Sequence, residues 1–374
     1  MNIIFLNLRD LLESKYGHVV PCSPTTIHDI VIRKATMIKE DVKIKLKKSP
    51  EYNLIFDEWT SASNRRYLNL ISRTSTEELN LGVVEIHETA SAENLLALIY
   101  DKMTKFEIPR EKAKFITCDG AAVNKKIGRV ADINLFLCLN HGIHLGVCEV
   151  LYEPSSMPKV IESESANLAE VVIQKPVCKD SNLKETLKKM RKMVKKIKQS
   201  PKLADLLRTK TNLSVILDVK TRWNSMIHMV RRFIKIRKEI NSVFVYEEID
   251  IPIDNSDIES LMQLIEILTP IEKAVVSLSA KNINLCTADL ILEKMFHEIE
   301  ALPVSLLKSK FEEALFTRIL QRRTSYSDVL FYFCKSNLGN PVNRFYIEPE
   351  KSEILNLLNK IIPAKNLSKT DGNF

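Results

Sequence analysis

This chain of 374 residues lacks the sequence features that define several common classes of protein. It has no Cys-x-x-Cys pair, and its seven cysteines are scattered, an odd count that makes a poor disulfide framework. No apolar run approaches the ~18 residues of a membrane span, and the first residues lack the basic and apolar segments of a signal peptide. We therefore expect a soluble chain with reduced thiols and no membrane partner.

Glycine is also scarce, at 8 residues, and proline is modest, at 14, so much of the chain should be regular structure, mainly helix. More than one compact unit is expected at this length, because single cores stop growing near ~250–300 residues. Lysine and arginine number 55 against 47 acidic residues, which gives a net charge of +8. This excess permits binding to a polyanion without proving it, because the location of charge matters more than its sum.

The hydrophobic pattern predicts an α/β fold class for the first part of the chain. Residues 1–50 form an N-terminal helical segment, in which Pro24 suits a helix start. Four short apolar runs predict strands at residues 53–56, 67–73, 79–86 and 114–118, the first three as an antiparallel meander. A helix begins at Ser91 between the third and fourth strands, and another follows the fourth. The order β-β-β-α-β-α is that of a ribonuclease H-like fold, assigned to residues 51–152.

The remainder is predicted to be largely helical. Residues 153–180 carry several Pro, Ser and Glu and predict an exposed loop. Apolar stripes at helical spacing then indicate a helical domain over residues 181–335. The residues from Lys365 onward look frayed.

Two aspartates stand at predicted strand ends. Asp57 follows the first strand and Asp119 the fourth, and in a unit of this type these two strands lie side by side. Both carboxylates would then face one site for a divalent metal, whose hard character favours oxygen ligands. The alternative is that each aspartate caps a turn or a helix, as aspartate does readily.

A tryptophan next to an arginine is a candidate contact for an extruded DNA base. Trp223 would stack on the base while Arg222 pairs with a phosphate. The alternative buries Trp223 as an ordinary core aromatic. Cys138, His141 and His144 lack a fourth ligand for zinc, so we expect no structural zinc there. His141 remains a weaker candidate for a contact near the phosphate.

Residues 184–202 form a densely basic amphipathic helix. The cations that we assign to DNA phosphates are Lys188, Arg191, Lys192 and Lys195. The same segment would serve as a nuclear import signal, so a nuclear location is expected. The alternative is a solvated face whose other side packs in the helical domain, and both can hold together.

Taken together these motifs resemble the transposases of the hAT superfamily and the zinc-finger BED-type proteins derived from them. The matching segments are residues 56–61 (FDEWTS), 116–124 (ITCDGAAVN), 138–145 (CLNHGIHL), 190–193 (MRKM) with 199–201 (QSP), and 218–225 (DVKTRWNS). Their order and spacing also match, over roughly residues 10 to 330.

The resemblance implies a ribonuclease H-like core interrupted by a large all-helical insertion domain, with residues 336–374 returning in part to the core. In such enzymes two Asp and one Glu hold two divalent ions, Mg²⁺ or Mn²⁺, that cleave and join DNA. Asp57 and Asp119 match the two Asp. Trp223 resembles the Trp that supports a flipped base, and His141 matches the Cys-x-x-His position.

The chain departs from the family pattern in three places. It lacks the BED zinc finger and the C-terminal dimerisation segment, and its third acid must be Glu348, Glu350 or Glu353, of which we choose Glu353. We therefore expect a transposase-derived nuclear DNA-binding protein with impaired catalysis. Its expected partners are DNA and possibly related transposase-like chains. An active metal-dependent transposase or nuclease is the alternative, and a translated remnant without a role is a third reading.

Overall fold

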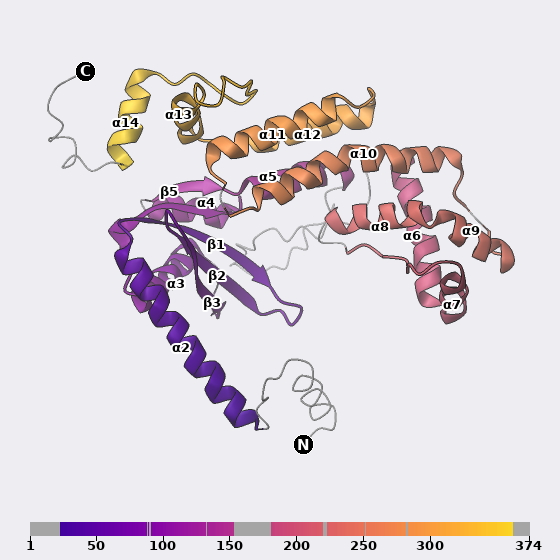
Figure 1. Ribbon diagram of the computed structural model, residues 1–374, viewed down its shortest axis with the longest axis horizontal. Coiled ribbons are helices and arrows are strands. Elements are labelled where there is room, and N and C mark those ends of the chain that lie inside the picture. Colours follow the sequence, from indigo (N-terminus) through magenta and orange to yellow (C-terminus); the bar gives the residue numbers. More distant parts are fainter. Residues whose placement is uncertain are drawn as a thin grey trace. The chain divides into compact units, whose positions relative to one another are not determined.

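The computed structural model describes residues 23–87, 89, 91–131, 133–152, 181–219, 223–250, 252–281 and 283–361. It is a mixed α/β structure with one five-stranded sheet. The chain divides into two compact units (Figure 1), which are unit 1, Met1–Thr117 with Lys126–Leu135, and unit 2, Cys118–Lys125 with Phe136–Phe374. The predicted loop at 153–180 and the predicted frayed tail lie outside the described residues. No helix in the described ranges has the length and apolar character to cross a membrane.

The three predicted strands of the meander are confirmed in unit 1. They are β1 (Tyr52–Thr60), β2 (Arg66–Arg73) and β3 (Glu78–Ile86). Both pairings are antiparallel, and alternate residues of β1 face the core, with Leu54 and Phe56 buried. β1 continues three residues beyond Asp57, so the prediction that this aspartate follows the strand is wrong. The apolar run ends at Phe56 because the part of β1 after this residue is largely exposed to solvent. This part still pairs with β2, so the strand continues.

The fourth strand, β4 (Ala113–Cys118), pairs with β1 in parallel. This confirms the expectation that the first and fourth strands are neighbours. A fifth strand, β5 (Asn134–Leu137), completes the order β3-β2-β1-β4-β5 and was not predicted. Four residues are too few to show a period of two, which explains the omission. A 3₁₀ turn, η1 (Arg110–Lys112), precedes β4.

Two helices accompany the sheet in unit 1. α2 (Pro24–Lys48) begins at the proline, as predicted, because its fixed φ and missing N–H suit the first helical turn. Only Val42 and Leu46, near its end, are buried. α3 (Ala92–Lys105) begins at the predicted cap, where the Ser91 hydroxyl accepts a 3.1 Å hydrogen bond from the amide of Asn94.

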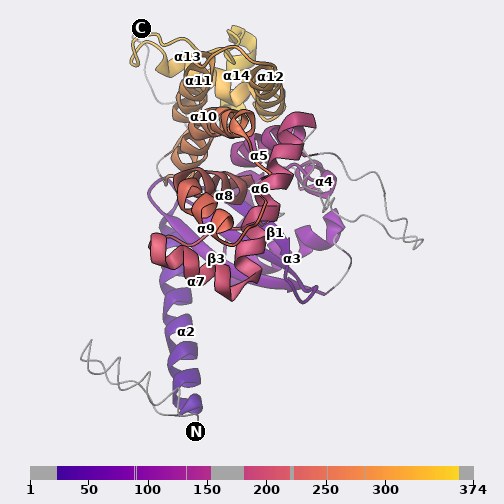
Figure 2. The ribbon, with the colours of Figure 1, turned by 90° about the vertical axis from the view of Figure 1, so that its right-hand side faces the viewer.

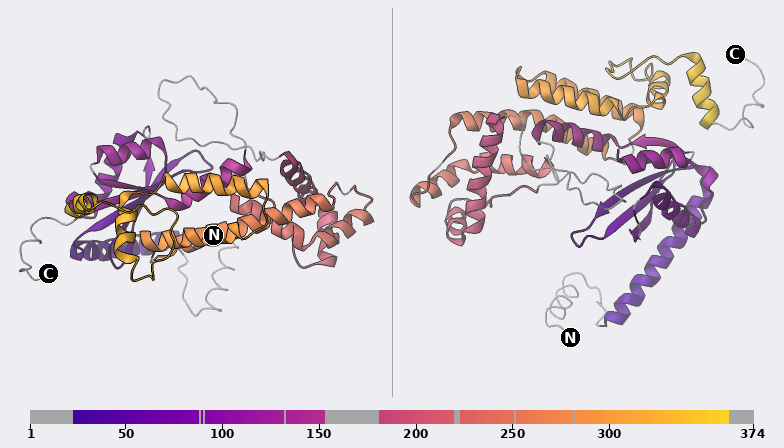
Figure 3. Two further views of the ribbon diagram at one scale, coloured as in Figure 1. Left: turned by 90° about the horizontal axis from the view of Figure 1, so that it is seen from above. Right: turned by 180° about the vertical axis from the view of Figure 1, so that it is seen from behind.

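Residues after β5 form helices, as the periodicity predicts. These are α5 (Leu139–Leu151), α6 (Ser181–Gln199), α7 (Pro201–Lys210), α8 (Trp223–Lys235), α9 (Arg237–Tyr246), α10 (Asn255–Leu278), α11 (Leu285–Glu300), α12 (Leu306–Leu320), α13 (Ser325–Cys334) and α14 (Lys351–Ile361). A further helix, α4 (Ala122–Val130), lies between β4 and β5. Figure 2 views α10, α11 and α12 nearly end-on, and Figure 3 shows α11 and α12 side by side. The unit division differs from the predicted domain boundaries, which stay a prediction.

Two glycines let α5 and α12 approach closely. A Cβ atom on Gly146 would lie 3.1 Å from the Cα of Leu315 and 3.3 Å from the carbonyl oxygen of Ala314. Gly142 lies one turn earlier on α5, and a Cβ there would lie 2.5 Å from the Cδ of Arg322. Small residues four apart thus form a flat stripe on which the partner helix packs.

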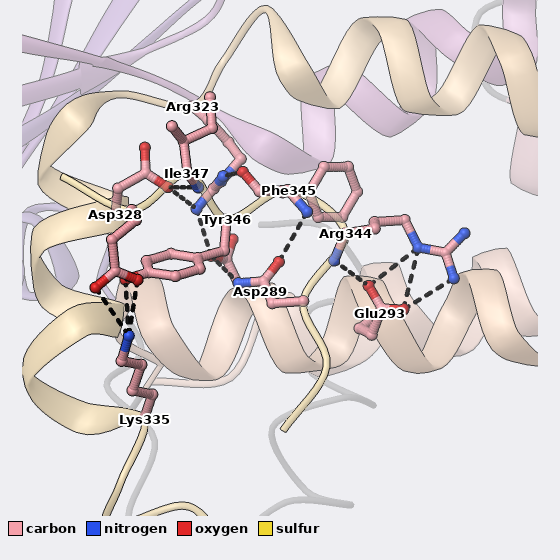
Figure 4. Close-up of polar contacts among 11 residues, drawn as sticks. Asp289, Glu293, Arg323, Asp328, Lys335, Arg344, Phe345, Tyr346 and Ile347 are labelled. Atoms are coloured by element: carbon pink, nitrogen blue, oxygen red, sulfur yellow. Dashed lines mark hydrogen bonds and ion pairs between the residues drawn. The ribbon is translucent and has the colours of Figure 1, made fainter. Parts of the chain in front are cut away.

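Paired charges hold the segment between α13 and α14 against the helices (Figure 4). Arg323 pairs with Asp289 at 2.7 Å and with Asp328 at 3.0 Å. Arg344 donates from Nε and Nη2 to the two carboxylate oxygens of Glu293. This segment has no regular structure, so side-chain pairing of this kind supplies its order.

Candidate nucleic-acid interface

Asp57 and Asp119 are placed by adjacent strands of the sheet. The parallel register of β1 and β4 ends with Ile55 opposite Thr117, and each aspartate lies two residues further along its own strand direction. Asp57 is exposed and is paired in register with Asn69 of β2. It belongs to unit 1 and Asp119 to unit 2. Their sharing of one metal stays a prediction.

Asp119 also acts as a local cap at the start of α4. Its Oδ1 accepts hydrogen bonds from the backbone amide of Ala121, at 2.9 Å, and from Nδ2 of Asn124, at 2.7 Å. Its charge, together with burial, raises the pKa of the neighbouring Cys118 thiol to about 12. The capping alternative is therefore realised for Asp119, and it leaves Oδ2 outside these bonds.

A third carboxylate does not join the two aspartates in the structure. Glu353, the predicted third acid, lies in the first turn of α14. Within the described ranges, no group of three or more His, Cys, Asp or Glu side chains is arranged to hold a metal ion. Glu353 as a catalytic residue stays a prediction.

His141 lies in the first turn of α5, where its ring is 5.9 Å from the ring of His144. Nε2 of His144 in turn lies 3.6 Å from the Sγ of Cys148. A hydrogen-bond donor at the start of a helix is well placed for a phosphate contact. The assignment of His141 to DNA stays a prediction.

Trp223 differs from the expectation of an exposed stacking surface. Its side chain is 3% exposed and packs in the helical core of unit 2 with Met226 and Ile227. An indole face that is covered by apolar side chains cannot stack on a base in this conformation. The core alternative is the one observed. Arg222 lies outside the described residues.

The exposed tryptophan is Trp59, which sequence reasoning did not single out for stacking. It is 40% exposed, and its ring stacks on that of Tyr67, its partner across β1 and β2, at 5.6 Å between centroids. Trp59 and Asp57 are two residues apart on one strand and so share a face of the sheet. The spacing of two residues between Asp57 and Trp59 was the sequence signal that could have placed both side chains on one face of the strand.

Two cations of α6 are occupied inside the protein. Arg191 donates from Nε and Nη2 to Oδ2 of Asp218, at 3.0 and 2.7 Å, and Lys189 pairs with Asp257 at 2.8 Å. Arg191, predicted to contact DNA, is thus engaged in tying α6 to the segment before α8. A largely buried pair of this kind, in which two N–H groups donate to one carboxylate oxygen, is structural, because opening it would strand the Asp218 charge.

The other predicted cations of α6 are exposed. Lys188, Lys192 and Lys195 follow one another at spacings of four and three, which puts them on one face of the helix. Lys188 lies 3.4 Å from Glu185, and neither Lys192 nor Lys195 forms an ion pair with another described residue. The opposite face, with Leu187, Met190 and Val194, is buried. α6 therefore has one packed face and one exposed basic face, while its contact with DNA stays a prediction.

Sequence reasoning also missed Arg322, a buried cation beside Asp119. Its side chain is packed against Gly120 and Gly142, which lie about 200 and 180 residues earlier in the chain. No spacing rule connects residues at that separation. The two glycines inside the matching segments were the one available signal.

The family model of the ZBED1 RNase-like helical domain matches residues 165–264. Within the described part of the chain this range holds α6 to α9 and the first part of α10. The match supports a transposase-derived protein of the ZBED and hAT type. No curated protein matches the chain.

Proposed function

We propose that this chain is a transposase-derived nuclear DNA-binding protein of the hAT type, with a ribonuclease H-like core and impaired catalysis. The observation that carries the proposal is the exposed lysine face of α6, within the range that matches the ZBED1 RNase-like helical domain. Cations that neutralise phosphates release condensed counterions, which gives affinity for any DNA sequence. Related transposase-like chains are proposed as further partners.

The strand order supports the ribonuclease H-like assignment of the core. An antiparallel meander of β1, β2 and β3, with β4 beside β1, is the arrangement that the sequence pattern implied for such a fold, and β5 adds a strand outside β4. The likeness is one of topology, and function still depends on the site.

The residues fit a single carboxylate pair better than a two-metal centre. Asp57 and Asp119 would supply the oxygen ligands that Mg²⁺ or Mn²⁺ prefers, but Oδ1 of Asp119 already accepts two hydrogen bonds. Among the residues that the structure describes, no group of three or more His, Cys, Asp or Glu side chains is arranged to hold a metal ion. Metal geometry depends on the full ligand set, so we derive no catalytic step through a metal.

The Asp57→Ala variant separates binding from catalysis. The proposal predicts that wild type and variant bind a labelled hairpin-ended DNA with the same affinity in fluorescence anisotropy, and that neither cleaves it with Mn²⁺ present. Cleavage by wild type that Asp57→Ala abolishes would establish the alternative, an active transposase or nuclease. Absence of DNA binding by a folded wild-type chain would overturn both and leave the remnant reading.

A further inference from the structure

Arg322 is buried just after α12, and no carboxylate of the described residues lies within ion-pair distance of its guanidinium, although the charge of Asp119 acts on it. Its side chain is 6% exposed, and its Nη1 donates a 2.8 Å hydrogen bond to the carbonyl oxygen of Arg318. Its Nε is buried and has no hydrogen-bond partner, and no ion pair to its guanidinium exists within the described ranges. Burial, followed by the nearby charge of Arg318, lowers the pKa of Arg322. Such a group costs stability unless something pairs with it.

The position of this guanidinium is set by two glycines. Nη2 lies 3.1 Å from where a Cβ of Gly120 would be, and Nε lies 2.9 Å from where a Cβ of Gly142 would be. Gly120 directly follows Asp119 and directly precedes the turn into α4. All these residues belong to unit 2. Because these two positions are glycines without side chains, the guanidinium of Arg322 can reach the start of α4 beside Asp119.

Arg323, the next residue, shows how this fold pairs a buried guanidinium with carboxylates, although its Nε, like that of Arg322, is buried without a hydrogen-bond partner. Its guanidinium pairs with Asp289 at 2.7 Å and with Asp328 at 3.0 Å (Figure 4). Arg322 has only one backbone carbonyl. Five N–H donors in a rigid fork are suited to two oxygens of a phosphate, and the missing acceptors of Arg322 are of that kind.

We propose that Arg322, with the N-terminal turn of α4, binds the phosphate of a DNA strand. The first amides of a nine-residue helix carry partial positive charge and favour an anion. The Asp119 carboxylate opposes an anion, but Arg322 offsets its charge and Oδ1 is held by Ala121 and Asn124. The anion site is independent of the proposed function, and only the identity of the anion as DNA rests on it.

Thermal unfolding in phosphate and in chloride at equal ionic strength tests the site directly. Phosphate stabilises folded proteins generally, so it should raise the melting temperature of both proteins, but it should raise that of wild type more than that of Arg322→Gln. Arg322→Lys keeps the charge without the fork and should respond less than wild type. Arg208→Gln removes an exposed arginine on α7, so it should respond like wild type. An equal phosphate response in wild type and Arg322→Gln, or none in wild type, would overturn the proposal.

DNA binding by the same variants identifies the source of the phosphate. Arg322→Gln should bind DNA about tenfold more weakly, and the salt dependence of its binding should fall by about one phosphate contact. Unchanged DNA affinity with a reduced phosphate response would assign the site to free phosphate and overturn the DNA assignment. If no variant binds DNA while the phosphate response depends on Arg322, the anion site stands and the proposed DNA-binding function fails.

Discussion

Buried charges in unit 2 carry different roles according to their partners. Arg323 and Asp289 are both almost fully buried and pair with each other, with Asn343 completing the contacts of Asp289 at 3.0 Å. Burial raises the pKa of Asp289, against the opposing pull of Arg323. A pair like this adds little net stability over an apolar pair, but removing one member leaves the other charge uncompensated.

Arg323→Met should therefore destabilise the protein by about 3–5 kcal/mol, because Asp289 and Asp328 lose their cation. Arg322→Met should cost far less, since no carboxylate lies within ion-pair distance of Arg322 and Asp119 keeps its hydrogen bonds from Ala121 and Asn124. Urea unfolding followed by circular dichroism measures both. Equal losses for the two variants would contradict the assignment of Arg323 to structure and of Arg322 to ligand binding.

At the scale of elements, α6 and α10 are joined through one carboxylate. Asp257 stands in the first turn of α10, where Asp254 caps the helix in a reciprocal capping box. Asp257 accepts hydrogen bonds from the Thr186 hydroxyl and from Nζ of Lys189, both on α6. Burial raises the pKa of Asp257, but these donors outweigh burial and hold the pKa below its usual value.

The direction of this shift fixes a pH dependence. A carboxylate whose pKa is lower in the folded state stabilises the protein above its unfolded pKa, and that stability is lost as pH falls through the lowered folded value. Asp257→Asn should cost about 1–3 kcal/mol at neutral pH, because Lys189 loses its anion. It should also flatten the loss of stability below pH ~4. An unchanged acid profile would show that this contact does not couple α6 to α10.

Elements of the fold differ in how far the sequence predicts them. Strands β1 to β3 and helix α3 were predictable because their apolar residues follow a clear period or a serine cap. β5 was not, since four residues show no period. Arg191 was assigned to DNA because it lies in a basic helix. Its hydrogen bond to Asp218, 27 residues later, could not be predicted, because no sequence rule connects residues at that separation. The burial of Trp223 could not be predicted from the sequence, because it depends on how the helices pack around it.

At the scale of the whole molecule, an excess of eight positive charges becomes meaningful only where it is exposed and unpaired. On α6 the partly buried Arg191 and Lys189 pair with Asp218 and Asp257, while Lys192 and Lys195 on the exposed face form no ion pair with a described residue and Lys188 lies 3.4 Å from Glu185. This division lets one helix both pack in its domain and present charge. It is the basis of the proposed DNA binding.

The salt dependence of DNA affinity tests this account most directly. Lys188, Lys192 and Lys195 are changed together to Gln, and the control changes three exposed lysines of other helices, Lys238, Lys294 and Lys360, so that net charge is equal. The account predicts that the α6 variant lowers the slope of log K against log salt by about 2–3, at ~0.9 per duplex phosphate contact, while the control keeps the wild-type slope. Equal slopes for the two variants would contradict it.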